Sequence, residues 1–342
     1  MHSLVSACRP TGTIAPMQLI RRLPCRLTDA RPSALAIGNF DGLHRGHQAL
    51  IECAVSLTPD NAPSLMCFEP LPQTLFAPDQ PVPRLMGLRD RLRVSESMGI
   101  QRLFQLPFDL DFAGLSPQQF IDRAIIDGAR AQHVIVGQDF RFGHRAAGDV
   151  DLLRRLGGSL GFDVHVIEPI MASDDEKVSS TGLRTALNDG NLDRAEAMLG
   201  RRYALSGRVL RGQQLGRTLG FPTLNLSVPV PPALAGIFAV CVNGLDDASA
   251  LARWPGVASL GKRPTVNGKE WLLEVHLIDF DGDLYGHHVS VEFIAKRRDE
   301  AHFDNLNDMT AVMQQDFRWA REQLQPIVTS ETPSEQRCAD VP

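Results

Sequence analysis

Cysteine is sparse in this chain and is never paired within a short motif. The six cysteines among 342 residues lie far apart and form no C-x-x-C pair: Cys8, Cys25, Cys53, Cys67, Cys241 and Cys338. This scatter excludes a zinc ribbon and a disulfide framework, and it predicts reduced thiols in the cytoplasm.

Long apolar runs and an excess of basic charge are also missing. The uncharged stretch 218–245 contains four prolines as well as Asn225 and Asn243, so it does not predict a membrane-spanning helix. The first sixteen residues have no continuous apolar core and do not resemble a secretory signal. The 35 basic and 40 acidic side chains give a formal net charge of −5. We therefore expect neither a nucleic-acid partner nor a membrane partner.

The first half of the chain alternates short apolar runs with longer amphipathic ones. The apolar runs predict strands at 34–37, 64–68, 102–106, 133–136 and 163–167. Helices are predicted at 48–57 and from the capping motif at 116–119 to about residue 130. This alternation predicts an α/β fold with a mostly parallel sheet, whose ligands bind at the carboxyl ends of the strands.

After residue 199, glycine and proline become frequent and the apolar runs shorten. Strands are predicted at 203–210, 236–242, 271–278 and 288–293, a spacing typical of a compact antiparallel barrel or sandwich. A helical segment at 182–200, with a turn at 188–190, is predicted to join the two halves, and a final helix is predicted at about 307–325.

The segment 38–47, GNFDGLHRGH, lies between the first of these strands and the first helix. A helix amino terminus offers free N–H groups and a partial positive charge, so a loop here is expected to bind phosphate. His44 and His47 can donate hydrogen bonds to phosphate oxygens, and Gly46 allows the backbone to approach closely. A zinc site made of Asp41, His44 and His47 is the alternative, and a plain turn stays open as well. The flanking glycines favour phosphate over metal.

A glycine-rich stretch at 207–226 contains a second candidate site. Thr223 and Asn225 are two apart on an extended segment, so their side-chain oxygens would point to the same side. Such oxygens suit magnesium, which bridges to substrate phosphates. On the residues alone, a structural interpretation in which the glycines only form barrel turns is favoured.

Glu274 lies on the polar face of the strand predicted at 271–278. The odd-numbered residues of that strand are apolar and predict its buried face. A solvated glutamate on a half-buried strand is the common explanation, and it stays open.

Several motifs taken together resemble those of the prokaryotic bifunctional riboflavin kinase/FAD synthetases. In the first half they are GNFDGLHRGH at 38–47, CFEP at 67–70, VGQDFRFG at 136–143 and VSSTGLR at 178–184. In the second half, GRTLGFPTLNL at 216–226, LEVHLIDF at 273–280 and RDEAHF at 298–303 are similar to the family's kinase motifs. The resemblance covers roughly residues 17–320 and is specific because the order and the spacing agree.

The resemblance implies a Rossmann-like α/β nucleotidyltransferase, followed by a small antiparallel β-barrel riboflavin kinase domain with a C-terminal helix. The expected parts are an FMN adenylyltransferase domain at 17–186, a helical linker at 187–201, a riboflavin kinase domain at 202–328 and a flexible tail at 329–342. Family members begin near a segment like 17–21. Residues 1–16 are therefore expected to be a disordered extension or the product of a misassigned start.

For the adenylyltransferase, the resemblance implies an ATP-binding set and a flavin-binding set. The ATP-binding residues are Gly38, Phe40, Asp41, His44, His47, Ser180, Thr181 and Arg184, of which the two histidines are also catalytic. The flavin-binding residues are Phe68, Asp139 and Phe140. FMN phosphate would attack the α phosphorus of ATP, a step that needs positioning and charge neutralisation more than a covalent nucleophile. Taken alone, the serines at 179–180 could equally cap a helix and Asp139 could be a turn residue.

For the kinase, the resemblance implies three sets of residues. The ATP-binding residues are Gly212, Gly216, Thr223, Asn225 and Tyr285, of which Thr223 and Asn225 serve magnesium. Glu274 would take the proton from the riboflavin 5'-hydroxyl as that oxygen attacks the γ phosphorus. The segment that closes over the flavin is matched by Arg298, Glu300 and Phe303, whose alternative interpretation is a charged helix start. Ser259 and Phe238 depart from the asparagine and the tyrosine common in the family.

The implied enzyme makes FMN from riboflavin in its second half and FAD from FMN in its first half, with release of pyrophosphate. Both steps would use ATP with Mg²⁺, the flavins are substrates and products, and FAD-requiring apoenzymes are candidate recipients. Two rivals stay open. One is a flavin sensor with an inactive domain, supported only by Ser259 and Phe238. The other is an RNA-binding module that uses basic residues at 201–202, 262–263 and 296–298, although these are scattered pairs rather than a continuous face.

Overall fold

The computed structural model describes residues 17–80, 82–211, 223–228, 230–245, 253–265, 268–280 and 282–329. The predictions for 1–16, for Gly212 and Gly216 and for the tail after residue 329 lie outside the described residues. The chain divides into two compact units, each assembled from separate stretches of sequence. The first unit comprises Met1–Asn39, Ala49–Leu75 and Val94–Glu168, and the second comprises Phe40–Gln48, Phe76–Arg93 and Pro169–Pro342.

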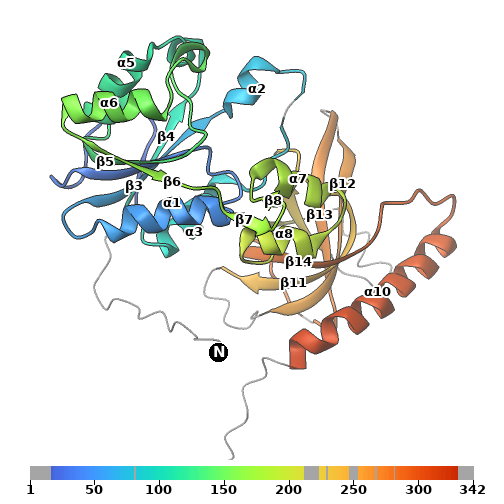
Figure 1. Cartoon of the computed structure of the whole chain (residues 1–342). Helices are drawn as coiled ribbons and strands as arrows, with labels where there is room; N and C mark the ends of the chain where they lie inside the picture. The colour runs from blue at the N-terminus through green and yellow to red at the C-terminus, as the bar shows by residue number, and fades with distance from the viewer. Residues whose placement is uncertain are drawn as a thin grey trace, which may run out of the picture. The chain divides into compact units, whose positions relative to one another are not determined.

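A six-stranded sheet of order β1-β4-β3-β2-β5-β6 forms the first unit, and all of its strand pairs are parallel (Figure 1). Its strands are β1 (Gln18–Ile20), β2 (Ser33–Ile37), β3 (Ala62–Glu69), β4 (Arg102–Pro107), β5 (Ala131–Gly137) and β6 (Asp163–Ile167). The predicted α/β fold and its five strands are confirmed. The sheet also contains β1, whose three residues are too few for a periodic pattern to reveal.

The described helices before residue 168 are α1 (Arg45–Ser56), α2 (Pro72–Phe76), α3 (Leu88–Ser97), α4 (Leu110–Ala113), α5 (Pro117–Phe120) and α6 (Val150–Leu160), with a short 3-10 turn at His144–Ala146. Among these helices, α1 and α5 were predicted, and α2, α3, α4 and α6 were not. The predicted capping box is confirmed, because the Ser116 hydroxyl accepts from the Gln119 N–H while the Gln119 side chain accepts from the Ser116 N–H. The predicted helix is present but ends at Ile126 rather than near residue 130, and after Phe120 it continues as a π-helical segment, Ile121–Ile126.

Phenylalanine supplies the large aromatic side chains of the first unit. The ring pairs among Phe68, Phe108, Phe112, Phe120, Phe140 and Phe142 have centroids 5.4 to 6.4 Å apart. All three tryptophans and both tyrosines of the chain occur after residue 200. Tilted and edge-on ring pairs each add about 0.5–1.5 kcal/mol beyond the area that they bury, so this cluster stabilises one side of the sheet.

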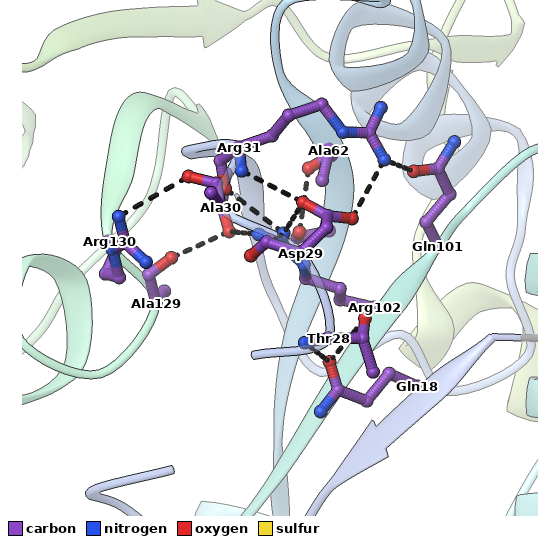
Figure 2. Close-up of polar contacts among 12 residues, drawn as sticks. Gln18, Thr28, Asp29, Ala30, Arg31, Ala62, Gln101, Arg102, Ala129 and Arg130 are labelled. Atoms are coloured by element: carbon purple, nitrogen blue, oxygen red, sulfur yellow. Dashed lines mark hydrogen bonds and ion pairs between the residues drawn. The ribbon is translucent and has the colours of Figure 1, made fainter. Parts of the chain in front are cut away.

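An arginine network joins the strand starts at the amino-terminal edge of the sheet (Figure 2). The buried Arg102 guanidinium donates to Asp29 Oδ1 at 2.5 Å, to Ser33 Oγ at 2.9 Å and to the Arg31 carbonyl at 3.1 Å. Arg31 in turn donates to Gln101 at 2.6 Å and to Asp29 at 3.0 Å, and this last bond is the main cause that lowers the Asp29 pKa. Ligands of parallel sheets bind at the opposite edge, so the network stabilises the fold rather than serving a site.

A closed antiparallel barrel of order β10-β13-β12-β11-β14-β9 forms the core of the second unit. Its strands are β9 (Ala204–Leu210), β10 (Thr223–Val228), β11 (Gly236–Gly244), β12 (Trp254–Thr265), β13 (Gly268–Leu277) and β14 (His288–Arg298). The interior is apolar and includes Leu226, Phe238, Leu273, Val275 and Phe293. The predicted barrel and the predicted alternation along 271–278 are confirmed.

Helices flank the barrel in the sequence on both sides. The helical segment predicted before it consists of α7 (Ser180–Asn188) and α8 (Leu192–Leu199), and it follows an unpredicted hairpin, β7 (Met171–Ser173) and β8 (Glu176–Lys177). The final helix, α10 (Leu306–Thr329), packs on the outside of the barrel (Figure 1). There, Ala320 and Leu324 contact a second apolar cluster formed by Ala239, Cys241, Val257 and Ile278. Among the described residues, no helix combines the length and the apolar character that a membrane span requires.

Candidate active sites

The chain between β2 and α1 makes a tight turn that leads to both histidines. Phe40 and Leu43 have left-handed backbones with φ of 47°, and Gly42 has φ of 88°. A Cβ at Gly42 would lie 3.1 Å from side-chain atoms of both Leu85 and Leu183, so conformation and contacts together require glycine there. Left-handed conformations at non-glycine residues cost energy and persist where the surroundings hold them, as is typical of functional loops.

The two histidine rings lie face to face. Their centroids are 3.7 Å apart with an interplanar angle of 16°, and the Phe40 ring lies 5.1 Å from that of His47. The His47 backbone N–H donates to His44 Nδ1 at 3.3 Å, so the ring proton of neutral His44 is on Nε2. Within the described part of the chain, the buried His47 Nδ1 has no hydrogen-bond partner. The pair therefore offers ring nitrogens to a ligand.

Burial keeps both histidines neutral near pH 7. It lowers the pKa of His44 from 6.5 to about 4, and the charges of Arg201 and Arg184 act in the same direction. Burial also lowers the pKa of His47 well below its usual value, with further contributions from His44 and Arg91. The pair can therefore donate hydrogen bonds as neutral dipoles rather than as cations.

We expect the chain to lose stability between about pH 6.5 and pH 4, partly through these histidines. In that range the unfolded chain takes up protons at His44 and His47, whereas the folded chain does not, so stability falls as pH falls. Urea unfolding followed by circular dichroism between pH 7.5 and 4.5 would measure the slope. His47→Asn should have a shallower slope than the parent chain, whereas His302→Asn at an exposed position should not change it. Equal slopes for the parent chain and His47→Asn would contradict this prediction.

Asp41 is fully buried and its carboxylate faces an arginine. It accepts a hydrogen bond from Arg184 Nη2 at 2.6 Å and one from the Leu85 N–H at 3.2 Å, and Arg84 Nε lies 3.7 Å away. The Arg184 Nε donates to the Pro83 carbonyl at 2.7 Å, which fixes the guanidinium from a second side. Because Arg184 engages the Asp41 carboxylate, the geometry favours the phosphate interpretation of this loop over the zinc alternative.

The SSTGLR motif begins α7 and contacts the same loop. The Ser179 hydroxyl caps the helix by accepting from the Gly182 N–H at 3.0 Å, and the Ser180 hydroxyl donates to the Asp41 carbonyl at 3.0 Å. Thr181 lies exposed in the first turn. Within the second unit, the structure thus brings together most of the predicted ATP-binding residues: Phe40, Asp41, His44, His47, Ser180, Thr181 and Arg184.

The remaining predicted adenylyltransferase residues belong to the first unit. Gly38 directly follows β2, Phe68 is near the end of β3, and Asp139 and Phe140 follow β5. These strands are neighbours with β2 in the middle, so all four residues lie at the carboxyl-end edge of the sheet, where ligands of parallel sheets bind. Asp139 is exposed, and the Phe140 ring is stacked at 5.6 Å on Phe142.

A row of polar side chains crosses the outer face of the barrel. Asn225 on β10 is directly opposite Glu274 on β13, and Glu274 is directly opposite Ser259 on β12. Opposite residues of antiparallel strands place their side chains on one face of the sheet. The residues next to them in sequence fill the interior: Leu224, Leu226, Ala258, Leu260, Leu273 and Val275. The row therefore lies outside the packed core.

A second pair of opposite residues lies on the same face, two positions further along β10 and β13. Thr223 is opposite His276, whose ring is 4.7 Å from that of Phe317 on α10. Thr223, Asn225 and Glu274 therefore share one face of the β10–β13 pair, and His276 on the same face contacts α10. Tyr285, the other described residue of the predicted kinase ATP-binding set, contacts Arg211 instead. The Arg211 guanidinium lies 5.6 Å from the centre of the Tyr285 ring.

The predicted flavin-closing segment of the kinase begins at Arg298, the last residue of β14, and its residues make contacts in two different directions. Arg298 donates to Asp316 of α10 through Nε at 3.3 Å and Nη2 at 2.6 Å, and Asp316 is buried. Glu300 accepts from Ser259 Oγ at 3.0 Å, and a Cβ on Gly261 would lie 1.7 Å from Glu300 Oε2. Glu300 is therefore at the end of the polar row, whereas Arg298 is directed to α10. Phe303 is half-buried.

Two family models match successive parts of the chain. Residues 27–182 match the family model for FAD synthetase, and residues 199–324 match that for riboflavin kinase. A bifunctional riboflavin kinase/FMN adenylyltransferase of Escherichia coli (strain K12) is 42% identical over 292 residues, which cover 84% of this chain and 91% of that protein. The chain belongs to the bifunctional riboflavin kinase/FMN adenylyltransferase family. A Pseudomonas fluorescens protein of the same name is 40% identical over 314 residues, covering 89% of this chain and 97% of its own.

A solved structure shares the fold across most of the chain. It is titled as a macrolide-efflux protein from Streptococcus pneumoniae, and it superimposes with a TM-score of 0.71 at 28% identity. The match covers 86% of this chain and 95% of that one. This family member and that protein therefore share both the parallel-sheet part and the barrel part.

Two residues at the kinase surface had no predicted role. The period of two placed His276 on the same face as Glu274, which the structure confirms, but no motif gave His276 a role. Asp316 occupies a helix face with no local motif, and only the tertiary structure shows that it binds Arg298 and lies 3.6 Å from Arg297. The one signal in the sequence that could have identified Asp316 was an acidic residue at a position expected to be buried on an amphipathic helix.

Proposed function

We propose that this family member phosphorylates riboflavin to FMN on the outer face of the barrel and adenylylates FMN to FAD at the 38–47 loop. ATP is the second substrate of both reactions. The proposal is supported by the two separate polar constellations, one on each part of the chain that matches the corresponding family model.

In the kinase reaction, Glu274 acts as the general base. Its carboxylate is half-buried and lies in the polar row between Asn225 and Ser259, on the side of the strand that faces away from the apolar interior. It takes the proton of the riboflavin 5'-hydroxyl while that oxygen forms a bond to the γ phosphorus of ATP. The bond from the γ phosphorus to its bridging oxygen breaks, and ADP leaves.

Thr223 and Asn225 fit a magnesium ion because both carry side-chain oxygens on the outward side of β10, where Asn225 is buried and Thr223 is half-buried. The Asn225 amide nitrogen donates to the Thr223 carbonyl at 3.5 Å, which directs Oδ1 away from its own strand. Magnesium prefers such oxygens together with water and substrate phosphates. When bound, the ion would neutralise phosphate charge, and Glu274 would take the proton.

The two departures from the family pattern are compatible with an active kinase. Ser259 donates to Glu300, a role that an asparagine amide could also fill. Phe238 is fully buried in the barrel interior, where its ring lies 5.0 Å from that of Phe293, so it does not touch the outer face. The proposed flavin contacts are made by Arg298, Glu300 and Phe303. To reach the flavin, Arg298 gives up its bonds to Asp316, and Glu300 gives up its bond from Ser259.

In the adenylyltransferase reaction, neutral His44 and His47 donate hydrogen bonds to the ATP phosphates. Arg184 supplies positive charge, and Asp41 acts through it by holding its guanidinium. A phosphate oxygen of FMN forms a bond to the α phosphorus, the bond from that phosphorus to its bridging oxygen breaks, and pyrophosphate leaves. Ser180 and Thr181 add donors, whereas Phe68, Asp139 and Phe140 serve the flavin.

Basic residues that could support the RNA alternative are engaged within the protein. Arg297 and Arg298 contact Asp316, and Lys262 lies 5.3 Å from the centre of the Trp271 ring. These contacts disfavour the RNA alternative.

The proposed product of the two reactions is free FAD, and FAD-requiring apoenzymes are its proposed recipients. A reducing cytoplasm stays the proposed location, because no disulfide joins the described cysteines: Cys25, Cys53, Cys67 and Cys241.

Incubation of the full chain with riboflavin, ATP and MgCl₂, followed by chromatography of the flavins over time, tests the proposal. FMN should form before FAD, and chelation of Mg²⁺ should stop both. If supplied FMN becomes FAD while riboflavin stays unchanged, the assignment of Glu274, Thr223 and Asn225 fails. If neither product forms, the enzymatic proposal is wrong, and salt-dependent RNA binding would then be measured.

A further inference from the structure

The backbone of the histidine loop is held by side chains outside the motif. Arg201, just after α8, donates from Nη2 to the Gly42 carbonyl at 2.7 Å and from Nη1 to the Leu43 carbonyl at 3.0 Å. Gln48 Nε2 donates to the same Leu43 carbonyl at 2.9 Å and to the Leu199 carbonyl at 2.7 Å. All of these residues belong to the second compact unit.

The two carbonyls that receive these bonds lie at the strained part of the loop. Gly42 and Leu43 both have left-handed backbones, and leucine is not stable there without support. Leu43 is also buried, so its carbonyl requires a protein donor. The peptide after Leu43 carries the His44 N–H, and the direction of that peptide sets the direction of the His44 ring.

We propose that Arg201, together with Gln48, is a positioning residue for FMN adenylylation, which fixes the 42–43 backbone so that His44 and His47 face the ATP phosphates. The inference rests on the proposed function of this loop. Arg201 lies in the segment that matches the riboflavin kinase model, 199–324, while the carbonyls it binds lie in the segment that matches FAD synthetase, 27–182. The adenylyltransferase therefore uses a residue from beyond its own family segment.

Arg201 has a second, electrostatic effect on the same histidine. Its charge and that of Arg184 both lower the pKa of His44, in addition to the larger effect of burial. The other groups at this place are the stacked His47 and the Asp41 carboxylate behind Arg184. Loss of the Arg201 charge would thus make His44 easier to protonate, whereas loss of the neutral Gln48 side chain would not.

Arg201→Gln in the full chain tests the proposal through the rate of adenylylation of supplied FMN. A displaced loop should lower kcat by about 10- to 100-fold with a smaller change in the KM for ATP, because misplacement affects the transition state most. The acid limb of the pH profile should move to higher pH. Arg201→Lys should recover part of the rate, since an ammonium can reach one of the two carbonyls.

Two further variants separate positioning from charge and from general destabilisation. Gln48→Leu should lower kcat without moving the acid limb, because it removes a neutral donor. Arg202→Gln is the matched control: it removes the same charge one residue away, where the guanidinium Nε is 3.8 Å from Glu196. It should leave both the rate and the pH profile unchanged, and riboflavin phosphorylation should stay within about twofold in all variants.

If the parent chain makes FAD and Arg201→Gln retains its rate and profile, the inference is wrong and the proposed function stands. Equal losses of both reactions in Arg201→Gln, with a lowered melting temperature, would also overturn it in favour of a purely structural role. If the parent chain makes no FAD from FMN, the proposed function of the loop itself fails.

Discussion

Glu274→Gln should lower the rate of riboflavin phosphorylation by about 10²- to 10⁴-fold while supplied FMN is still converted to FAD. Glutamine keeps the shape of the side chain but cannot accept the proton of the 5'-hydroxyl. The side chain lies on the outer face of β13, and its neighbours Leu273 and Val275 fill the interior, so the substitution leaves the barrel packing intact. Loss of one reaction would therefore report chemistry rather than unfolding.

Initial rates of FMN formation and of FAD formation from FMN, measured on the same preparation, check this prediction. Glu270→Gln is a control on the same strand, because Glu270 is exposed and pairs with Arg263 at the far end of the β12–β13 ladder. Its kinase rate should equal that of the parent chain. A Glu274→Gln chain that keeps its kinase rate, or that loses both reactions, would refute the role of Glu274.

His44→Asn should reduce FMN adenylylation by about 10²- to 10³-fold and leave riboflavin phosphorylation unchanged. The asparagine oxygen can occupy the place of Nδ1 and accept the His47 N–H, so the turn is kept. No atom of asparagine reaches the place of Nε2, where the proton of neutral His44 lies. The expected loss is therefore that of a single donor to the phosphates.

His44→Gln provides the matched comparison, because its longer side chain places an amide nitrogen near the position of Nε2. It should retain a larger part of the adenylylation rate than His44→Asn. Release of pyrophosphate from ATP and FMN measures both variants, and riboflavin phosphorylation in each serves as the internal control. Equal rates for the two variants, or a lower rate for His44→Gln, would show that His44 is not the donor.

Much of the fold could be predicted because the hydrophobic pattern of each strand is local. The alternation along 271–278 placed Leu273, Val275 and Glu274 on their observed faces, and Ser116 and Gln119 form the predicted capping box. The π-helical segment after Phe120 could not be predicted, because its widened turn differs little from an α-helix in sequence period. The hairpin β7–β8 was also missed, because its strands are too short to show alternation.

For the candidate sites, the sequence likewise identified residues within local motifs but not the contacts between distant positions. Motifs identified His44, His47, Thr223 and Asn225, and the structure brings each pair onto one surface or into one loop. The contact between Asp41 and Arg184 joins positions 143 apart, and its geometry is invisible in either motif. Arg201 was noted only as part of a basic pair, because a side chain that binds backbone carbonyls requires no particular residue as its partner.

The phenylalanine-rich core of the first unit has an optical consequence. Because that unit contains neither tryptophan nor tyrosine, the tryptophan and tyrosine emission of the chain comes from the second unit alone. Trp254, Trp271 and Trp319 are thus built-in reporters for ligand titrations of the barrel and need no added label. One tryptophan introduced in place of Phe140, itself a proposed flavin-binding residue, would be the sole indole of the first unit.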